Sequence, residues 1–166
     1  MKIIYSSKKK KIISQLNEQY GISKLPYLLI KFGDPRKFQK FSGPKNSGNF
    51  SGDKIRIYSG SLSNDELNTL AANLIIETIG LYFAKTEKDG IRLTLDGIQI
   101  LKQQITKSIL ELNDKQADEW LRGFDLNIKT GRSFKILKNN NEFLGCGKST
   151  GEKITNFVPK ERRIKS

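Results

Sequence analysis

The chain has one cysteine, Cys146, and no histidine among its 166 residues, so neither an intrachain disulfide nor a Cys/His zinc site can hold its fold together. A chain of this length buries roughly two thirds of its unfolded surface, so a hydrophobic core is sufficient. The length predicts one ordinary domain or two small ones that share an interface. The missing histidine also excludes a Ser-His-Asp triad, and we expect no metal and no cofactor.

Positive charge dominates the chain, in which 30 Lys and Arg stand against 17 Asp and Glu for a net charge of +13. A polyanion is the expected partner of such a chain. The net charge is +10 over residues 1–60, −4 over residues 61–126 and +7 over residues 127–166. We interpret the two basic ends as contact surfaces, with solvated, disordered tails as the alternative.

The apolar runs are short, and none approaches the roughly 20 residues that a membrane span needs. The first residues, MKIIYSSKKKK, have too short an apolar run for a secretory signal. We therefore expect a cytoplasmic protein with no membrane partner, and a single cysteine fits a reducing compartment.

Apolar residues at helical spacing predict a first helix over residues 8–19 that stops at Gly21. Its first turn carries four cations, although the helix dipole disfavours positive charge at that end. We predict phosphate contacts there, with a solvated first turn as the alternative; the residues are Lys8, Lys9, Lys10 and Lys11.

Two strand-like runs, residues 27–32 and 54–58, flank a long hairpin loop rich in Gly, Pro, Ser and Asn. Loops of this length are usually functional or disordered. Residues 34–53 interleave phenylalanines with cations, a composition typical of a loop that becomes ordered on RNA. We expect the loop to be mobile without RNA, and we assign RNA contacts to Arg36, Lys37 and Lys40.

A capping box at Ser63 and Glu66 predicts the start of a second helix. Its apolar stripe is assigned to the core and consists of Leu67, Leu70, Ala71, Leu74 and Ile75. A strand pair is expected next, residues 80–85 and 91–95 around a turn at 87–90.

Two short helices follow, one around Ile98 and one opened by Asn113, with Trp120 inward and Gly123 past its end. Three short strands are then predicted, residues 134–138, 142–147 and 153–158, joined by turns of Asn, Thr and Gly. The predicted fold class is α+β: an N-terminal α/β domain over residues 1–88 with the basic hairpin loop, and a β-rich domain over residues 89–166.

Motifs for chemistry are weak in this sequence. Gly147-Lys148-Ser149 is similar to the end of a phosphate-binding loop, but Glu142 stands where the first glycine belongs, and a strand rather than a helix is predicted to follow. Cys146 has no neighbour that would activate a thiol. Because no acid, base, nucleophile or metal set is visible, we predict a binding protein and not an enzyme.

The C-terminal segment carries four cations in six residues, a pattern typical of phosphate contacts. Adjacent arginines also offer bidentate forks and stacking planes. A disordered solubilising tail is the alternative.

Three stretches, in this order, closely resemble a PUA-type RNA-binding module: DEWLRG at 118–123, FLGCGK at 143–148 and NFVPK at 156–160. More narrowly, residues 60–166 resemble the pre-PUA plus PUA-like unit of the Sun/Nop-type rRNA cytosine-5 methyltransferases, a plan shared by the Nip-type ribosome-assembly factors. The resemblance implies a small pseudo-barrel that grips structured RNA. Short, Lys- and Ile-rich chains of this family suggest an archaeal source.

The resemblance carries RNA contacts over to the turn after the second short helix and to the neighbouring strands. There Gly123 would let the RNA backbone approach closely. The other contacts implied are Arg122, Lys129, Arg132 and Lys148, with Lys160, Arg162 and Arg163 adjoining. The methyltransferases' cofactor domain and Pro-Cys catalytic motif have no counterpart in this sequence.

We therefore predict an rRNA-binding protein, either a ribosome-assembly factor or a ribosome-associated one, that binds RNA by shape through its basic ends. The alternative is a non-catalytic targeting subunit that brings a separate rRNA-modifying enzyme to its substrate, with the acidic middle, particularly the helix over residues 113–122, as the protein contact. A general nucleic-acid coating protein is a third hypothesis. Ribosomal RNA or a ribosomal subunit is the expected partner, together with ribosomal proteins or an rRNA methyltransferase.

Overall fold

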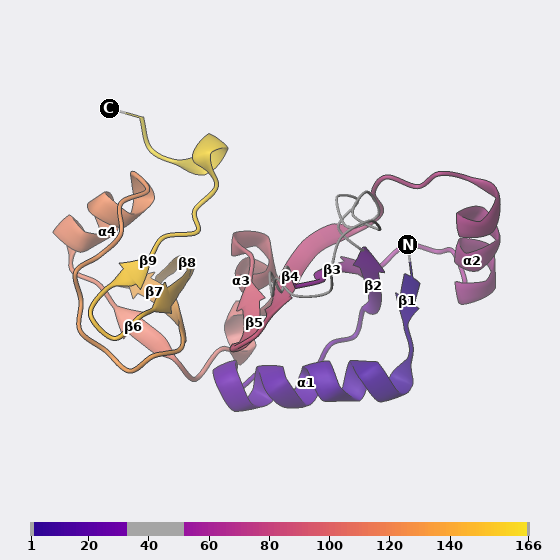
Figure 1. Ribbon diagram of the computed structural model, residues 1–166, viewed down its shortest axis with the longest axis horizontal. Helices are drawn as coiled ribbons and strands as arrows, with labels where there is room; N and C mark the ends of the chain where they lie inside the picture. Colours follow the sequence, from indigo (N-terminus) through magenta and orange to yellow (C-terminus); the bar gives the residue numbers. More distant parts are fainter. Residues whose placement is uncertain (1, 33–51, 166) are drawn as a thin grey trace, which may run out of the picture.

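The computed structural model describes residues 2–32 and 52–165, which form two sheets joined side by side (Figure 1). The first sheet is antiparallel throughout, and its strands follow chain order: β1 (Lys2–Ile4), β2 (Leu28–Phe32), β3 (Lys54–Tyr58), β4 (Leu81–Glu87) and β5 (Gly90–Leu93). In the second sheet β6 pairs in parallel with β7 and the other pairs are antiparallel: β6 (Ile109–Glu111), β7 (Phe134–Asn139), β8 (Glu142–Ser149) and β9 (Ile154–Thr155).

Helices cover these sheets and connect them. The longest, α1 (Ser6–Tyr20), buries Ile12, Leu16 and Tyr20 and ends at Gly21, whose positive φ of 83° suits a residue without a side chain. The remaining helical elements are α2 (Asn64–Asn73), α3 (Leu95–Leu101), η2 (Lys102–Gln104), α4 (Asp114–Leu121) and η3 (Lys160–Arg162).

The larger of two buried clusters spans both sheets. It joins side chains of α1 and the first sheet to Phe134, Ile136 and Cys146 of the second sheet. The smaller cluster surrounds Trp120 of α4, which is fully buried and donates from Nε1 to the carbonyl oxygen of Leu144 at 3.0 Å. The sheets therefore pack as one body.

The predicted α+β class is confirmed, and so are the capping box at Ser63 with Glu66 and the helix start at Asn113, which forms a capping box with Gln116. The strand predicted over residues 153–158 is only two residues long, Ile154–Thr155. The division after residue 88 stays a prediction; this point is the turn between β4 and β5, which pair in one sheet. The basic loop with Arg36, Lys37 and Lys40 lies outside the described residues, apart from residues 52 and 53.

The prediction that the apolar stripe of the second helix is core was wrong. Of its five residues only Leu67 is buried, while Leu74 is 60% and Ile75 97% exposed. The physical reason is the position of α2, which contacts β1 at the end of the molecule far from the second sheet (Figure 1). The helix also ends at Asn73, so Leu74 and Ile75 lie beyond it.

Among the helices that the structure describes, none is long and apolar enough to cross a membrane. Within residues 2–32 and 52–165, no group of three or more Cys, Asp or Glu side chains could hold a metal ion.

Candidate nucleic-acid interface

The turn that follows α4 is the centre of the candidate interface. Asn113 caps the start of α4, and the helix ends at Arg122 and Gly123, whose φ of 94° turns the chain. Arg122 donates from Nε to the carboxylate of Asp118 one helical turn earlier, at 2.7 Å. This hydrogen bond and charge hold the pKa of Asp118 below its ordinary value and raise the pKa of Arg122.

Side-chain hydrogen bonds fix this turn in place. The amide of Asn156 donates to the carbonyl oxygens of Trp120 and Phe124, at 2.7 and 3.0 Å. The backbone N–H of Asn156 donates to Asp125, which also pairs with Lys153 at 2.9 Å. These contacts lower the pKa of Asp125, with the Asn156 bond as the largest cause. The turn is therefore preorganised by residues that are about 30 positions away in the sequence.

On this fixed turn the side chain of Phe124 is 59% exposed. A large apolar ring in water on an ordered segment is unfavourable unless something covers it. Nucleobases stack on such rings. Two cations are near: Arg122 directly precedes Gly123 in the chain, and the guanidinium of Arg163 packs against Gly123. Phe124 is absent from the sequence-based set; the signal that could have found it is an aromatic residue directly after Arg122-Gly123.

The C-terminal segment docks on the same turn. The N–H of Ile164 donates to the carbonyl oxygen of Leu121, and Nε of Arg163 donates to that of Val158 at 3.1 Å. A Cβ built on Gly123 would lie 2.4 Å from Nε of Arg163. The guanidinium thus fills the space that Gly123 leaves, and a phosphate arriving there would meet Arg163 before the backbone.

The neighbouring cations of this segment differ in what they contact. Arg162 forms a two-bond ion pair with Asp96 of α3, at 2.7 and 3.0 Å, which raises the pKa of Arg162. Lys160 is exposed at the start of η3. The segment through Lys165 is therefore ordered against α3 and α4, with Arg162 as its anchor.

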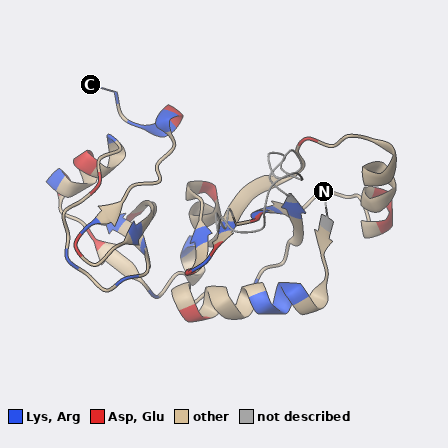
Figure 2. Cartoon of the chain, viewed as in Figure 1, with Lys and Arg blue, Asp and Glu red and all other residues tan. Residues whose placement is uncertain are grey.

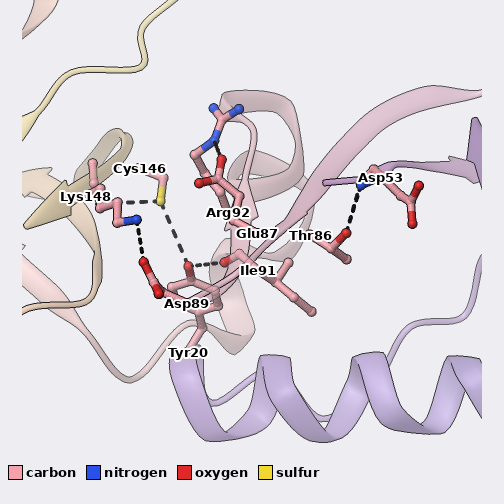
Figure 3. A network of polar contacts seen from close by, with 10 residues as sticks. Tyr20, Asp53, Thr86, Glu87, Asp89, Ile91, Arg92, Cys146 and Lys148 are labelled. Carbon is pink, nitrogen blue, oxygen red and sulfur yellow. Dashed lines mark hydrogen bonds and ion pairs between the residues drawn. The ribbon is translucent and has the colours of Figure 1, made fainter. Parts of the chain in front are cut away.

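A second group of predicted residues surrounds a hollow of about 550 Å³ at the edge of the second sheet, lined by Asp89, Arg132, Ser133, Phe134, Lys148, Ser149 and Thr150. Arg132 donates from Nε to the carbonyl oxygen of Thr150 at 3.0 Å. Nζ of Lys148 lies 5.6 Å from the ring centre of Phe134. The same atom donates a hydrogen bond to the carboxylate of Asp89 (Figure 3). Lys129 lies outside this lining and pairs at the surface with Glu152 at 3.2 Å.

The third predicted group, the lysines of α1, lies apart from the other two. Lys8, Lys10 and Lys11 are exposed on the half of α1 that follows β1, beside the first sheet (Figure 2). Lys9 is half-buried and donates from Nζ to the carbonyl oxygen of Tyr27 at 2.8 Å, so it connects α1 to the chain entering β2. The predicted contacts therefore do not form one continuous face.

A buried polar network beneath the second group explains Cys146. The hydroxyl of Tyr20 donates to the carbonyl oxygen of Ile91 at 2.6 Å and lies 4.0 Å from the Cys146 sulfur (Figure 3). Burial raises the pKa of the Cys146 thiol to about 12 and also raises the pKa of Tyr20. The thiol is therefore protonated at neutral pH and packs as a small core side chain.

Comparisons with known proteins agree with this geometry. Residues 107–164 match the family model described as the methyltransferase RsmF PUA domain, a segment that begins just before β6 and ends after η3. Ribosomal RNA small subunit methyltransferase F of Aliivibrio fischeri is 30% identical over 96 residues, which cover 57% of this chain and 20% of the relative. The same enzyme of Vibrio cholerae is 27% identical over 99 residues, 58% of this chain and 21% of the relative.

The longer alignment, to ribosomal RNA small subunit methyltransferase F of Aeromonas hydrophila, is 27% identical over 146 residues. It covers 84% of this chain but 30% of the relative, so the chain spans a third or less of the length of these relatives. These relatives are bacterial, and the archaeal source stays a prediction. Residues 107–164 are therefore a PUA domain of the RsmF type, and the chain is a distant homologue of the C-terminal region of those methyltransferases.

Proposed function

We propose that this chain binds ribosomal RNA, with the turn after α4 as the centre of its contact surface. One observation carries the proposal: an ordered turn exposes Phe124 next to Gly123, with Arg122 directly before that glycine in the chain and the guanidinium of Arg163 packed against it. Stacking on a ring together with cationic contacts to phosphate is how proteins hold unpaired nucleotides. The PUA family match and the net charge of +13 support the same conclusion.

Each group on this surface has a distinct chemical role in the proposal. Phe124 stacks on a base. Nε of Arg163 donates to the carbonyl oxygen of Val158, so the two terminal nitrogens of the guanidinium donate to phosphate. Lys160 adds a further cation. Arg132 and Lys148 hold a second phosphate at the edge of the second sheet, once Lys148 exchanges Asp89 for RNA.

In the cell, the proposed role is ribosome assembly or association with the ribosome in the cytoplasm, without chemistry of the chain's own. The matched segment supports this because it is the PUA domain of the methyltransferase family. Since the relatives are named for the small subunit, small-subunit rRNA is the first RNA to test. The alternative of a targeting subunit for a separate rRNA-modifying enzyme remains a hypothesis with the same RNA contact.

The test is sequencing of RNA crosslinked to the protein in its native cells, together with a sucrose gradient. The proposal predicts crosslinks concentrated at one rRNA site and co-sedimentation with a ribosomal subunit. Crosslinks spread over many RNAs, with the protein at the top of the gradient, would contradict it and favour a coating protein. A stable complex with a modifying enzyme in the absence of RNA would favour the targeting subunit.

A further inference from the structure

Apolar side chains lie on α2 and close before and after it. Leu62 and Leu70 line one hollow, together with Asp65, Glu66 and Thr69. Leu74 lies one helical turn after Leu70, and its N–H donates to the Leu70 carbonyl oxygen at 2.8 Å. Ile75 follows, and its side chain is 97% exposed. We call these four residues, Leu62, Leu70, Leu74 and Ile75, the α2 strip.

The α2 strip is carried by an ordered helix and by the residues close before and after it. The capping box at Ser63 fixes the start of the helix: its hydroxyl accepts from the Glu66 N–H, and Glu66 accepts from the Ser63 N–H at 2.7 Å. Within the helix, Leu67 is buried and Asn68 donates to the Tyr5 hydroxyl at 3.1 Å. The helix is therefore held in place through Leu67 and Asn68, while Leu62, Leu74 and Ile75 beside its ends are exposed to water, which is typical of an interaction surface.

The chain segment that carries the strip has a charge opposite to that of the molecule as a whole. Between Arg56 and Lys85 the chain has no Lys or Arg, and its acidic residues there are Asp65, Glu66 and Glu77. The hydrogen bonds to Ser63 lower the pKa of Glu66, which keeps its carboxylate charged. A local acidic surface on a chain of net charge +13 repels phosphate and attracts cations.

We propose that the α2 strip docks a basic protein, through a segment whose apolar side chains are bordered by Lys or Arg. The apolar side chains would enter the hollow at Leu62 and Leu70 and cover Leu74 and Ile75. The bordering cations would pair with Asp65, Glu66 and Glu77 around it. The acidic border argues against RNA as the occupant, and this contact is separate from the turn after α4, which belongs to a different part of the fold (Figure 1).

The test uses two synthetic helical peptides that share one row of leucines and differ only in the residues that border it. One peptide carries lysines at those positions and the other glutamates. Each is titrated into the ¹⁵N-labelled chain, and amide shifts and affinity are measured by NMR. We expect the lysine peptide to bind at least about tenfold more tightly, because opposite charges attract and like charges repel. The shifts should concentrate in residues 62–77.

Two variants test whether the peptide binds at the α2 strip or binds nonspecifically to exposed apolar side chains. The double variant Leu74→Ser/Ile75→Ser should bind the lysine peptide at least about tenfold less tightly. Because both side chains are exposed, the variant should keep its fold. Ile100→Ser removes another exposed isoleucine, on α3, and should leave the affinity unchanged. Equal affinity for both peptides, shifts elsewhere in the chain, or no effect of the double variant would overturn the proposal. A dimer in sedimentation equilibrium that the double variant abolishes would do the same and assign the strip to a second copy.

Discussion

Lys148 of β8 and Asp89 of the turn between β4 and β5 form an ion pair of 2.5 Å across the boundary between the two sheets. They are 59 positions apart in the sequence, and the Lys148 bond and charge hold the pKa of Asp89 below its ordinary value. Both groups are at the surface, so the pair contributes little to stability. In the proposed RNA contact, Lys148, which the family resemblance assigns to RNA, therefore already has an anionic partner.

Replacing Asp89 with asparagine should therefore increase RNA affinity. The change removes a negative charge beside the hollow and frees Lys148 for phosphate, for which we expect a gain of about two- to fivefold at low salt. Filter binding with a small-subunit rRNA fragment measures it. Asp65→Asn on α2 removes the same charge far from the second sheet and is the matched control. Weaker binding by Asp89→Asn would show that Asp89 holds Lys148 in position for RNA and does not compete with RNA for it.

Phe124→Ala should weaken RNA binding by about 1–3 kcal/mol, because the variant loses a stacking face. The stability to urea should change by less than about 0.5 kcal/mol, since the ring is mostly in water. Phe124→Tyr keeps the stacking face and should bind like the original chain. If Phe124→Ala binds RNA with unchanged affinity, the turn is not a base contact.

The triple variant Lys160→Ala, Arg162→Ala and Arg163→Ala should bind every RNA sequence less tightly. Its plot of log affinity against log salt should be shallower by up to about three phosphate contacts. Because Arg162 is already paired with Asp96, Arg162→Ala alone should change the slope less than Arg163→Ala alone. An unchanged slope in the triple variant would mean that the segment contacts no phosphate.

Trp120→Ala should cost on the order of 3–5 kcal/mol in the free energy of unfolding, because it empties the centre of the smaller core cluster and leaves the Leu144 carbonyl without its donor. Urea denaturation measures the loss. Tryptophan fluorescence of the original chain should be blue-shifted in the native state, because this is the only tryptophan. Emission typical of water-exposed indole would contradict the buried position.

Cys146 should be unreactive toward thiol reagents at pH 8 until the chain unfolds, since burial raises its pKa to about 12. The raised pKa also fixes the sign of a pH effect. Protonated Cys146 favours the folded state, so this contribution is complete below the ordinary thiol pKa of about 9 and is lost as pH rises from there toward 12. Cys146→Ala should remove that part of the alkaline loss of stability. Rapid labelling of the native chain would refute the burial.

The local elements of this fold were predictable because their signals are local. Gly21 ends α1, and Ser63 and Asn113 cap their helices, since each interaction is made within a few residues. The three-residue strands β1 and β6 were not predicted. Both are too short for a periodic pattern, and both exist through pairing with strands that are more than 20 residues away.

Burial and side-chain partners were the harder part. Helical spacing shows that Leu70 and Leu74 share a face with Leu67, but it cannot show that only Leu67 finds a partner. In the same way, the family resemblance assigns Lys148 to RNA, but the sequence cannot place Asp89 opposite it. Phe124 becomes a candidate only once Asn156 is seen to fix its turn. These features depend on tertiary contacts between distant residues.

The most direct test of the proposed RNA contact is ultraviolet crosslinking of the purified chain to small-subunit rRNA, followed by mass spectrometry of the crosslinked peptides. The account predicts a nucleotide attached at Phe124, lost in Phe124→Ala, because a stacked ring is in position to crosslink to its base. Crosslinks confined to α1, or none within residues 107–164, would contradict it.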